Sequence, residues 1–439
     1  MTPFDEPLRR AGDTFVLRRA TVPTVMVPQG LPAAGDGLAA ADIWITSGLV
    51  TDISCDARPG DGRAEIDLAR AMVWALPVDC HTHVDKGQVW SRTPNPDGTF
   101  EAALLAARAD RAAHFGADDL RCRANFILDC AEAHGTGALR SHVDADRQTF
   151  DTAFAVLMEL AEERRQRLHV QLAPFTGPGE DPAFVTRLAK AAQCDHGGVL
   201  SAFVHPDPGL DDFLDLVFGL AADHGLALDF HADETLDPES RCLGVIAEAA
   251  LRHRFDGSIL VGHACSLSVQ DTDTVARTLD RVARAGIAIV ALPLCNAYLQ
   301  DRHPSRSPRR RGIAPVHEIA ARGIPVAIAS DNVRDPFHAH GDMDLAEVYR
   351  QATMLMHLDH PVSEWPAAIS TTPAALLGLP HRGRLTPGGP ADLLIFPARD
   401  WSEFCARPPV RRTRMRGGLV QDAEPPPFSR LDNLDGMTP

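Results

Sequence analysis

Short apolar segments alternate with amphipathic segments from residue 72 to residue 329, and this alternation constrains the fold more than any other feature. The expected strands are residues 72–78, 138–143, 169–175, 199–204, 227–230, 259–261, 287–293 and 326–329. Strands that alternate with helices indicate a parallel sheet. Eight such units over about 300 residues predict an α/β fold, a (β/α)8 TIM-like barrel with its active site at the carboxyl ends of the strands.

The two ends of the chain show a different pattern from this middle region. Residues 14–75 contain short β-type segments separated by clusters of Gly, Pro and Asp, without a helical period. A turn and a strand pattern return at residues 383–396, and residues 410–420 add another strand pair with Gly417-Gly418 at its tip. We therefore expect residues 1–75 and 381–439 to form one small discontinuous β-sandwich domain with a C-terminal tail. Residues 76–380 are expected to form the barrel.

The first expected barrel strand ends in the sequence His81-Thr82-His83. Residues i and i+2 of a strand project from the same face, so both imidazoles point the same way. Two imidazoles at the end of a strand form half of a site for a divalent metal ion. An isolated His-x-His pattern is more often a solvated strand edge, so this interpretation depends on the residues at the ends of the other strands.

The other expected strands also end in residues that bind metals or transfer protons. They are His142 at the end of the second strand, His231 and Glu234 after the fifth, His263 after the sixth and Asp331 after the eighth. The carboxyl ends of all the strands meet at one end of a barrel, so the pattern predicts one shared site. Chance is a poor explanation for five such strand ends in a single barrel.

The amino-acid composition argues against some classes of binding partner. The formal net charge of −16 argues against a nucleic-acid backbone or an anionic membrane as a partner. Nine cysteines without a Cys-x-x-Cys pair indicate reduced thiols rather than a disulfide framework. Neither a signal peptide nor an apolar stretch of about 18 residues is visible in the sequence. We expect a cytoplasmic protein that acts on a small molecule.

Several motifs together resemble those of one enzyme family. They are His81-Thr82-His83-Val84-Asp85-Lys86, His142-Val143-Asp144, His231-Ala232-Asp233-Glu234, Gly262-His263, Ser330-Asp331-Asn332 and Asp335-Pro336-Phe337. With these motifs the chain resembles the metal-dependent amidohydrolase superfamily, and within it the cytosine deaminase-like group. The resemblance implies one divalent ion, Zn²⁺ or Fe²⁺, held by His81, His83, His231 and Asp331. Binuclear members use a carboxylated lysine of the fourth strand, and the absence of lysine from residues 199–205 agrees with a single ion.

The resemblance also implies a hydrolytic deaminase. Its substrate would be a small nitrogen heterocycle of the cytosine, purine-base or creatinine type, or a pterin, and ammonia would leave after attack by a metal-bound hydroxide. Glu234 would take a proton from water and deliver it to a ring nitrogen. His263 would hydrogen-bond the attacking oxygen, and Asp331 would carry the second proton to the departing amine. Proton transfer of this kind contributes about 10²–10⁴ in rate.

Four further residues are candidates for substrate binding. Cytosine deaminases carry a Gln at the end of the third strand, and the matching position here is Gly177. The residue after the metal-binding Asp is Asn332, whose amide both donates and accepts hydrogen bonds. Phe337 either stacks on the substrate or belongs to the core. Lys86 is one of two lysines in the chain and directly follows the metal motif.

Two alternative functions remain open. Triazine-degrading relatives share the His-x-His-x-Asp-Lys form, so the chain is alternatively an amidohydrolase that cleaves a cyclic amide, or an N-alkylamine from a triazine-like ring. Ammonia release separates these reactions. The non-enzymatic alternative is a catalytically silent metal-binding barrel, against which the presence of Glu234, His263 and Asp331 argues. A homo-oligomer is expected, because members of this group often self-associate.

Overall fold

The computed structural model describes residues 2–28, 30–56, 58, 61–144, 146–193, 197–432 and 434. Their contacts divide the chain into two compact units. The small unit comprises Met1–Val78, Glu132–Ala138 and Asp344–Pro425, and the barrel unit comprises Asp79–Ala131, Leu139–Met343 and Pro426–Pro439. Residues 344–380, which we expected in the barrel domain, therefore group by contact with the small unit.

The barrel unit is built on an eight-stranded sheet whose strand order follows the chain from β6 to β13. Its strands are β6 (Val78–Thr82), β7 (Ala138–Val143), β8 (His169–Thr176), β9 (Val199–Val204), β10 (Ala227–Ala232), β11 (Ile259–His263), β12 (Ile287–Ala291) and β13 (Val326–Ile328). Neighbouring strands from β8 to β13 pair in parallel. A parallel bridge between Thr82 and Asp331 joins the two ends of the sheet. The predicted (β/α)8 barrel is confirmed.

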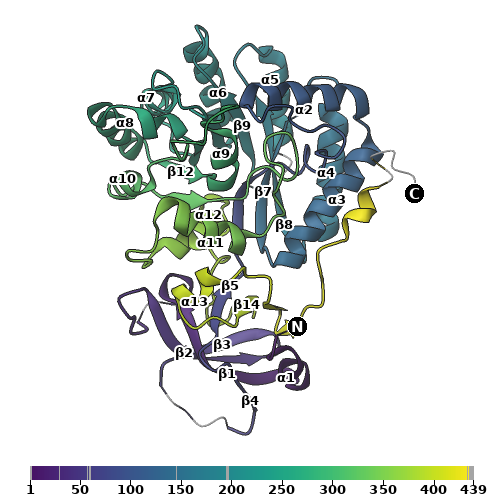
Figure 1. Ribbon diagram of the computed structural model, residues 1–439, viewed down its shortest axis with the longest axis vertical. Coiled ribbons are helices and arrows are strands. Elements are labelled where there is room, and N and C mark those ends of the chain that lie inside the picture. Colours follow the sequence, from purple (N-terminus) through teal and green to yellow (C-terminus); the bar gives the residue numbers. More distant parts are fainter. Residues whose placement is uncertain are drawn as a thin grey trace. The chain divides into compact units, whose positions relative to one another are not determined.

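Helices connect and surround these strands, as Figure 1 shows for the upper part of the picture. They are α2 (Phe100–His114), α3 (Ala117–His134), α4 (Phe150–Arg164), α5 (Pro182–Ala192), α6 (Leu210–His224), α7 (Cys242–His253), α8 (Thr272–Arg284), α9 (Pro293–Leu299) and α10 (Val316–Ala320). Local sequence explains several of their ends. Asp181 caps α5 by accepting from the Ala183 N–H, with Pro182 at the first helical position. Gly225 ends α6 in the left-handed conformation that glycine adopts most readily.

The barrel strands are buried along their length, and β7, β11 and β12 have no exposed residue. Such continuous burial is expected because helices cover the outer face of a parallel sheet and side chains fill the inner one. The C-terminal tail adds a short 3-10 helix, η4 (Phe428–Leu431), to this unit. Its Phe428 ring stacks on Phe126 of α3 at 5.6 Å. Residues 433 and 435–439 of the predicted tail lie outside the described residues.

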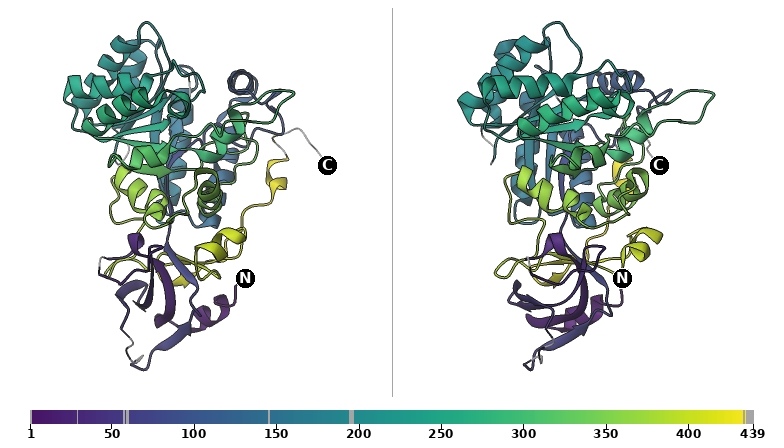
Figure 2. Two further views of the ribbon diagram at one scale, coloured as in Figure 1. Left: turned by 60° about the vertical axis from the view of Figure 1, so that its left-hand side comes forward. Right: turned by 90° about the vertical axis from the view of Figure 1, so that its left-hand side faces the viewer.

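The small unit contains one mixed eight-stranded sheet in the order β16-β15-β14-β5-β1-β2-β3, with β4 paired to β1. Its strands are β1 (Thr14–Pro23), β2 (Leu38–Thr46), β3 (Leu49–Ser54), β4 (Ala64–Asp67), β5 (Met72–Ala75), β14 (Leu393–Phe396), β15 (Thr413–Arg416) and β16 (Leu419–Val420). Figure 2 shows the purple N-terminal strands beside the yellow C-terminal ones. The predicted discontinuous β domain, built from both ends of the chain, is confirmed.

Helices and an aromatic cluster complete the small unit. The helices are α1 (Asp5–Arg10), η1 (Thr24–Met26), α11 (Leu345–Met356), η3 (Trp365–Ile369), α12 (Thr371–Leu376) and α13 (Trp401–Ala406). The buried Trp74 ring contacts Tyr349 of α11 at 5.8 Å and Phe404 of α13 at 4.7 Å. Aromatic packing of this kind explains why α11 groups with this unit.

The expected first barrel strand, residues 72–78, is in fact two strands. Met72–Ala75 forms β5 and pairs antiparallel with β14, so it belongs to the small sheet. The barrel strand β6 begins only at Val78. Pro77 lies between them and has no N–H to continue a ladder, which explains the break that the apolar pattern did not reveal. Among the described helices, none combines the length and the apolar character needed to cross a membrane.

Candidate active site

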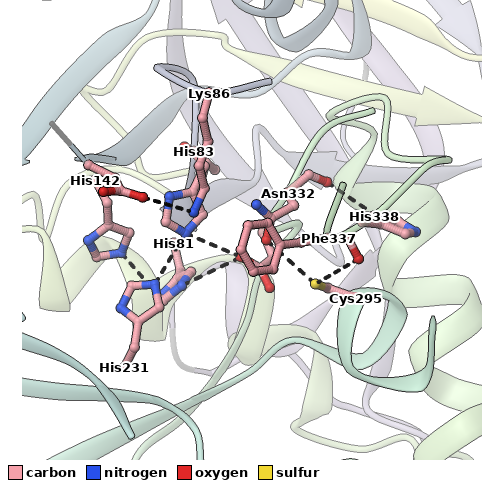
Figure 3. Close-up of polar contacts among 12 residues, drawn as sticks. His81, His83, Lys86, His142, His231, Cys295, Asn332, Phe337 and His338 are labelled. Atoms are coloured by element: carbon pink, nitrogen blue, oxygen red, sulfur yellow. Dashed lines mark hydrogen bonds and ion pairs between the residues drawn. The ribbon is translucent and has the colours of Figure 1, made fainter. Parts of the chain in front are cut away.

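Four imidazoles and one carboxylate converge at the carboxyl ends of the barrel strands. Figure 3 shows three of these imidazoles, those of His81, His142 and His231, beside one another. His81 lies on β6, His142 on β7, His231 on β10 and His263 on β11, while Asp331 follows β13. All five side chains are buried. The strand ends singled out in the sequence therefore do meet in one place.

The four predicted metal ligands lie close to one another in pairs and triplets. The Nε2 atoms of His83 and His231 are 3.1 Å apart. The Asp331 Oδ1 atom lies 3.7 Å from His81 Nε2 and 3.6 Å from His83 Nε2. One ligand atom each from His81, His83 and Asp331 lies within 4.8 Å of the others, and the same holds for His81, His231 and His263.

The chemistry of these atoms fits a cation. Within the described part of the chain, His81 Nε2 and both carboxylate oxygens of Asp331 are buried without a hydrogen-bond partner. Unpaired buried polar atoms are costly, and a divalent ion among them would satisfy all three. Burial also holds the pKa values of His81, His83 and His231 well below the usual range. These imidazoles are therefore neutral, which is the form that binds metals.

His142, a strand-end histidine to which the family resemblance assigned no ligand role, supports this cluster. Its Nε2 atom lies 3.3 Å from Nδ1 of His81, on the side of the ring away from Asp331. A histidine that ligates a metal commonly uses its other ring nitrogen in a hydrogen bond that sets the tautomer. His142 therefore orients the His81 ring so that Nε2 faces the cluster.

Asp79 and Ser330 join the first and last barrel strands beneath the site. The Ser330 hydroxyl donates to Asp79 Oδ2 at 2.5 Å, and the Asp331 N–H donates to the His81 carbonyl at 3.0 Å. Asp79 is fully buried, and burial raises its pKa to about 7. The hydrogen bond from the Asp331 N–H joins the backbone of Asp331 to that of His81. It therefore fixes two of the predicted metal ligands relative to each other.

Glu234 and His263 face each other beside the cluster and share one partner, Asn296 of α9. The Asn296 amide N–H group lies 3.0 Å from His263 Nδ1 and 3.4 Å from Glu234 Oε1. Since the amide donates to Nδ1, the His263 proton must lie on Nε2, and that atom has no hydrogen-bond partner within the described residues. Burial raises the pKa of Glu234 well above its usual range, and the charge of Asp331 adds to that shift. Burial lowers the pKa of His263 to about 3.

The backbone at these strand ends is strained. Asp233, His263, Ala264 and Asp331 have φ values of 56°, 72°, 48° and 66°, in the left-handed region that non-glycine residues rarely adopt. Each such residue costs on the order of 1–3 kcal/mol and persists only where the surroundings enforce it. The surroundings hold Asp233 in this conformation, because its carboxylate accepts hydrogen bonds from the N–H groups of Cys242 and Leu243 at the start of α7. Strain of this kind clusters at functional sites.

Phe175 forms a wall of the cluster that the sequence did not suggest. Its ring lies edge-on to His231 at 4.9 Å, to His142 at 5.9 Å and to His83 at 6.5 Å. The alternation of side chains along β8 could have suggested it, because Phe175 is the last aromatic residue of that strand. Gly177, the predicted substrate-binding position, follows β8, and a Cβ there would meet the Phe203 carbonyl oxygen at 3.3 Å.

The other three predicted substrate-binding residues lie together. Lys86 Nζ lies 4.5 Å over the Phe337 ring and 3.5 Å from Asp144 Oδ2. Phe337 is buried in a small apolar cluster with Ala103, Cys295 and Leu299. Figure 3 shows Asn332 and Phe337 adjacent to the imidazole cluster. The structure thus brings Lys86, Asn332 and Phe337 together near the imidazoles, and adds Phe175 as a neighbour that the sequence did not suggest.

A sequence model described as the amidohydrolase family matches residues 130–421, more than half of the chain. The chain is also 44% identical over 425 residues to a pterin deaminase of Rhizobium rhizogenes (strain K84), covering 96% of this chain and 97% of that relative. The chain belongs to the amidohydrolase family. An N-isopropylammelide isopropyl amidohydrolase of Pseudomonas sp. (strain ADP) is 23% identical over 370 residues, covering 81% of this chain and 87% of that relative.

Solved structures of amidohydrolases have the same fold. A 5-methylcytosine deaminase from Klebsiella pneumoniae matches with a TM-score of 0.77 and 22% identity, covering 92% of this chain and 96% of the other. An N-isopropylammelide isopropylaminohydrolase from Burkholderia multivorans matches with a TM-score of 0.73 and 22% identity, covering 93% and 97%. The predicted family is confirmed, and so is the enzyme class, a hydrolase of carbon–nitrogen bonds other than peptide bonds that deaminates a heterocycle. Amidohydrolases of this family use a divalent metal ion.

Proposed function

We propose that this amidohydrolase deaminates a pterin, a 2-amino-4-oxopteridine. Water adds to ring carbon C2, the bond from C2 to the exocyclic amine breaks, and the products are a 2,4-dioxopteridine and ammonia. The observation that carries the deaminase assignment is the Glu234 carboxyl group, whose side chain is 7% exposed and which lies 3.3 Å from His263 Nδ1, beside the predicted metal ligand Asp331. The pterin assignment is supported by the relative that is 44% identical over nearly the whole chain.

A divalent ion held by His81, His83, His231 and Asp331 would lower the pKa of water at the site and so supply a nucleophile at neutral pH. Glu234 then has two tasks. It accepts the proton released by the water and donates it to N1, the ring nitrogen next to C2. The raised pKa of Glu234 suits this exchange, because a group that titrates nearer neutral pH both takes and gives a proton readily.

His263 and Asp331 complete the proton transfers. The Nε2–H of His263 donates to the oxygen that forms on C2, where negative charge develops, and Asn296 holds the ring in that tautomer. Asp331 carries the second proton to the amine, so that ammonia leaves rather than an amide ion. Among the substrate-binding candidates, Asn332 hydrogen-bonds the edge of the pterin ring. Phe337 packs against the face of the pterin ring, and Lys86 lies over the Phe337 ring. Gly177 leaves space beside the Phe203 carbonyl for the second ring.

The test is ammonia release from protein loaded with Zn²⁺ or Fe²⁺. Pterin, cytosine, isoguanine, creatinine and N-isopropylammelide are supplied in parallel. Wild-type protein should release ammonia from pterin, and Glu234→Gln should lower kcat by about 10²–10⁴ without loss of bound metal. Glu239→Gln is the matched control, because that side chain is 76% exposed and lies five residues further along the chain. Isopropylamine release from N-isopropylammelide, with no ammonia from pterin, would support the triazine-type alternative instead.

We also propose that the ion is Zn²⁺ or Fe²⁺, since three imidazoles and one carboxylate suit both. Metal analysis of protein purified without added metal identifies it, and a different dominant ion would refute the proposal. The eight described cysteines are all free thiols, which fits the cytoplasm. The expected homo-oligomer rests on the family alone, and a monomer in sedimentation experiments would refute it.

A further inference from the structure

Asp335 is a buried carboxylate that neither the motif for metal binding nor the proposed mechanism uses. It lies in the loop after β13, and its side chain is inaccessible to solvent. Its Oδ1 atom accepts from the N–H groups of Phe337 and His338 at 2.9 and 3.0 Å. Its Oδ2 atom accepts from the Asn332 side-chain amide at 2.7 Å. Burial raises the pKa of Asp335 and the charge of Lys86 opposes that shift.

These contacts determine which way the Asn332 amide faces. Asp335 Oδ2 needs a donor, so the NH₂ group of Asn332 points toward it and the carbonyl oxygen Oδ1 points away. His338 holds the same residue from the other side, because its Nδ1 lies 3.2 Å from the Asn332 backbone carbonyl. Both anchors belong to one tight turn, in which Asp335 and His338 exchange backbone hydrogen bonds at 3.2 and 3.1 Å.

In this orientation, the side-chain oxygen Oδ1 of Asn332 is a buried acceptor that can take a further hydrogen bond. Its partner within the described residues is the Cys295 thiol at 3.5 Å. A thiol is a weak donor, and a carbonyl oxygen has two lone pairs. A buried acceptor of this kind favours a ligand that brings an N–H group to it. Figure 3 shows Asn332 beside the imidazoles of His81 and His83, so its amide lies near the position where the reacting carbon must sit.

We propose that Asp335 is a positioning residue that turns the Asn332 oxygen toward the substrate and thereby selects rings with an N–H group next to the reacting carbon. The proposal rests on the proposed function. In a pterin, C2 lies between N1, which accepts the proton from Glu234, and N3–H, which donates to Asn332. In cytosine, the carbon that carries the amine lies between N3 and a C–H group, which donates no comparable hydrogen bond. The site therefore takes 2-amino-4-oxopyrimidine edges, which include pterins and isocytosine, in preference to cytosine.

Two variants test whether the orientation of the Asn332 amide matters, because both keep polar side chains of nearly the same size at positions 332 and 335. In Asp335→Asn, the new amide must satisfy the two backbone N–H groups with its oxygen, so its NH₂ group faces the NH₂ group of Asn332. Asn332 then turns over and presents NH₂ to the substrate, which clashes with N3–H. In the double variant Asn332→Asp/Asp335→Asn, the amide at 335 donates to the carboxylate at 332, and an oxygen again faces the substrate.

Binding is measured in the Glu234→Gln background, where turnover is slowed by about 10²–10⁴-fold, by rapid fluorescence titration with pterin and with its 3-deaza analogue, which has C–H in place of N3–H. With Asp335 present, pterin should bind roughly 5- to 150-fold more tightly than the analogue, the ratio expected for one buried hydrogen bond. Asp335→Asn should remove that preference and the double variant should restore it. In turnover, kcat/KM for pterin should fall by a similar factor in Asp335→Asn and recover in the double variant, with metal content unchanged.

Two outcomes would overturn the proposal. Equal affinities for pterin and the 3-deaza analogue in the presence of Asp335 would show that N3–H is not read. A preference that survives Asp335→Asn would show that Asp335 does not control the amide. Neither result depends on whether wild-type protein releases ammonia from pterin, which tests the proposed function separately.

Discussion

Arg140 of β7 and Asp229 of β10 form an ion pair in the interior of the barrel, with Arg140 Nη1 2.7 Å from Asp229 Oδ2 and side chains 2% and 0% exposed. Gln171 of β8 joins them, because its Oε1 accepts from Arg140 Nε at 2.8 Å. Arg140 and Asp229 each precede a histidine of the site, His142 and His231, by two residues on the same strand. Residues i and i+2 of a strand share a face, so the ion pair forms the layer beneath the imidazoles.

The first prediction concerns this pair. Asp229→Ala should lower the free energy of unfolding by about 3–5 kcal/mol, because it leaves a buried guanidinium without its carboxylate. Urea unfolding measures the change. Asp67→Ala is the control, because the Arg19–Asp67 pair is more than half exposed and should contribute at most about 1 kcal/mol. A loss no larger than in the control would contradict a structural role for the pair.

The second prediction concerns metal removal. Chelation should lower Tm, and Zn²⁺ or Fe²⁺ should restore it, because the ion satisfies buried atoms that otherwise lack partners. At free metal about 1,000 times Kd, the gain in stability is roughly 4 kcal/mol. Differential scanning calorimetry with and without metal checks this. His231→Ala should abolish the metal-dependent shift, whereas His360→Gln should not, since that side chain is 89% exposed.

The third prediction concerns Phe175, whose ring packs on three of the histidines. Phe175→Ala should lower metal affinity by about 10- to 100-fold, the range typical for residues that orient metal ligands. Competition with a chromophoric chelator measures the affinity. Phe184→Ala on α5 removes a buried ring that contacts Phe150 instead of the histidines. If both variants lose metal affinity equally, the effect is general destabilisation rather than support of the ligands.

The fourth prediction concerns pH and the buried pair of Asp344 and Arg412 in the small unit. Asp344 caps α11 and accepts from Arg412 Nη1 at 2.8 Å. Burial alone would raise the pKa of Asp344, but the charge and hydrogen bond of Arg412 outweigh it and lower the pKa below 3.8. A carboxyl group with a depressed folded-state pKa stabilises the fold above its unfolded pKa and loses that contribution as pH falls through its folded pKa.

Asp344→Asn should therefore be less stable than wild type near neutral pH, and the gap should narrow as pH falls below about 3.8. Unfolding curves for both proteins across that range measure the gap. A gap that stays constant with pH would mean that Asp344 acts only as a helix cap. Asp400→Asn is the control, because Asp400 caps α13 through the Glu403 N–H and no ion pair to a buried arginine is described for it.

The barrel and most of the site could be predicted because their signals are local. Each strand is a short apolar run, and each ligand comes at the end of such a run, so barrel topology alone brings His81, His231 and Asp331 together. The start of the first strand was predicted wrongly, because the apolar run continues through Pro77 from one sheet into another. Hydrophobic pattern cannot tell which of two sheets a short strand joins.

Features that depend on the direction of a side chain could not be predicted from the sequence. Phe175 and Gly177 are two residues apart, and only the course of β8 shows that the aromatic ring, not the glycine, meets the histidines. Asn296 lies on α9, and no periodicity in the sequence indicates that its amide reaches His263 of β11. The orientation of the Asn332 amide depends on a hydrogen bond to Asp335, and residue identity alone leaves both orientations possible.

The bridge between Thr82 and Asp331 has a consequence for how this enzyme is made. Two of its proposed metal ligands lie on strands separated by more than half of the chain, yet the Asp331 N–H donates directly to the His81 carbonyl. At about 5–20 residues per second, a ribosome needs roughly 12 to 50 seconds to add the later strand after the earlier one. A nascent chain can therefore offer an incoming ion only the imidazoles of the early strands. Selection of the correct metal must wait until synthesis has closed the ring of strands.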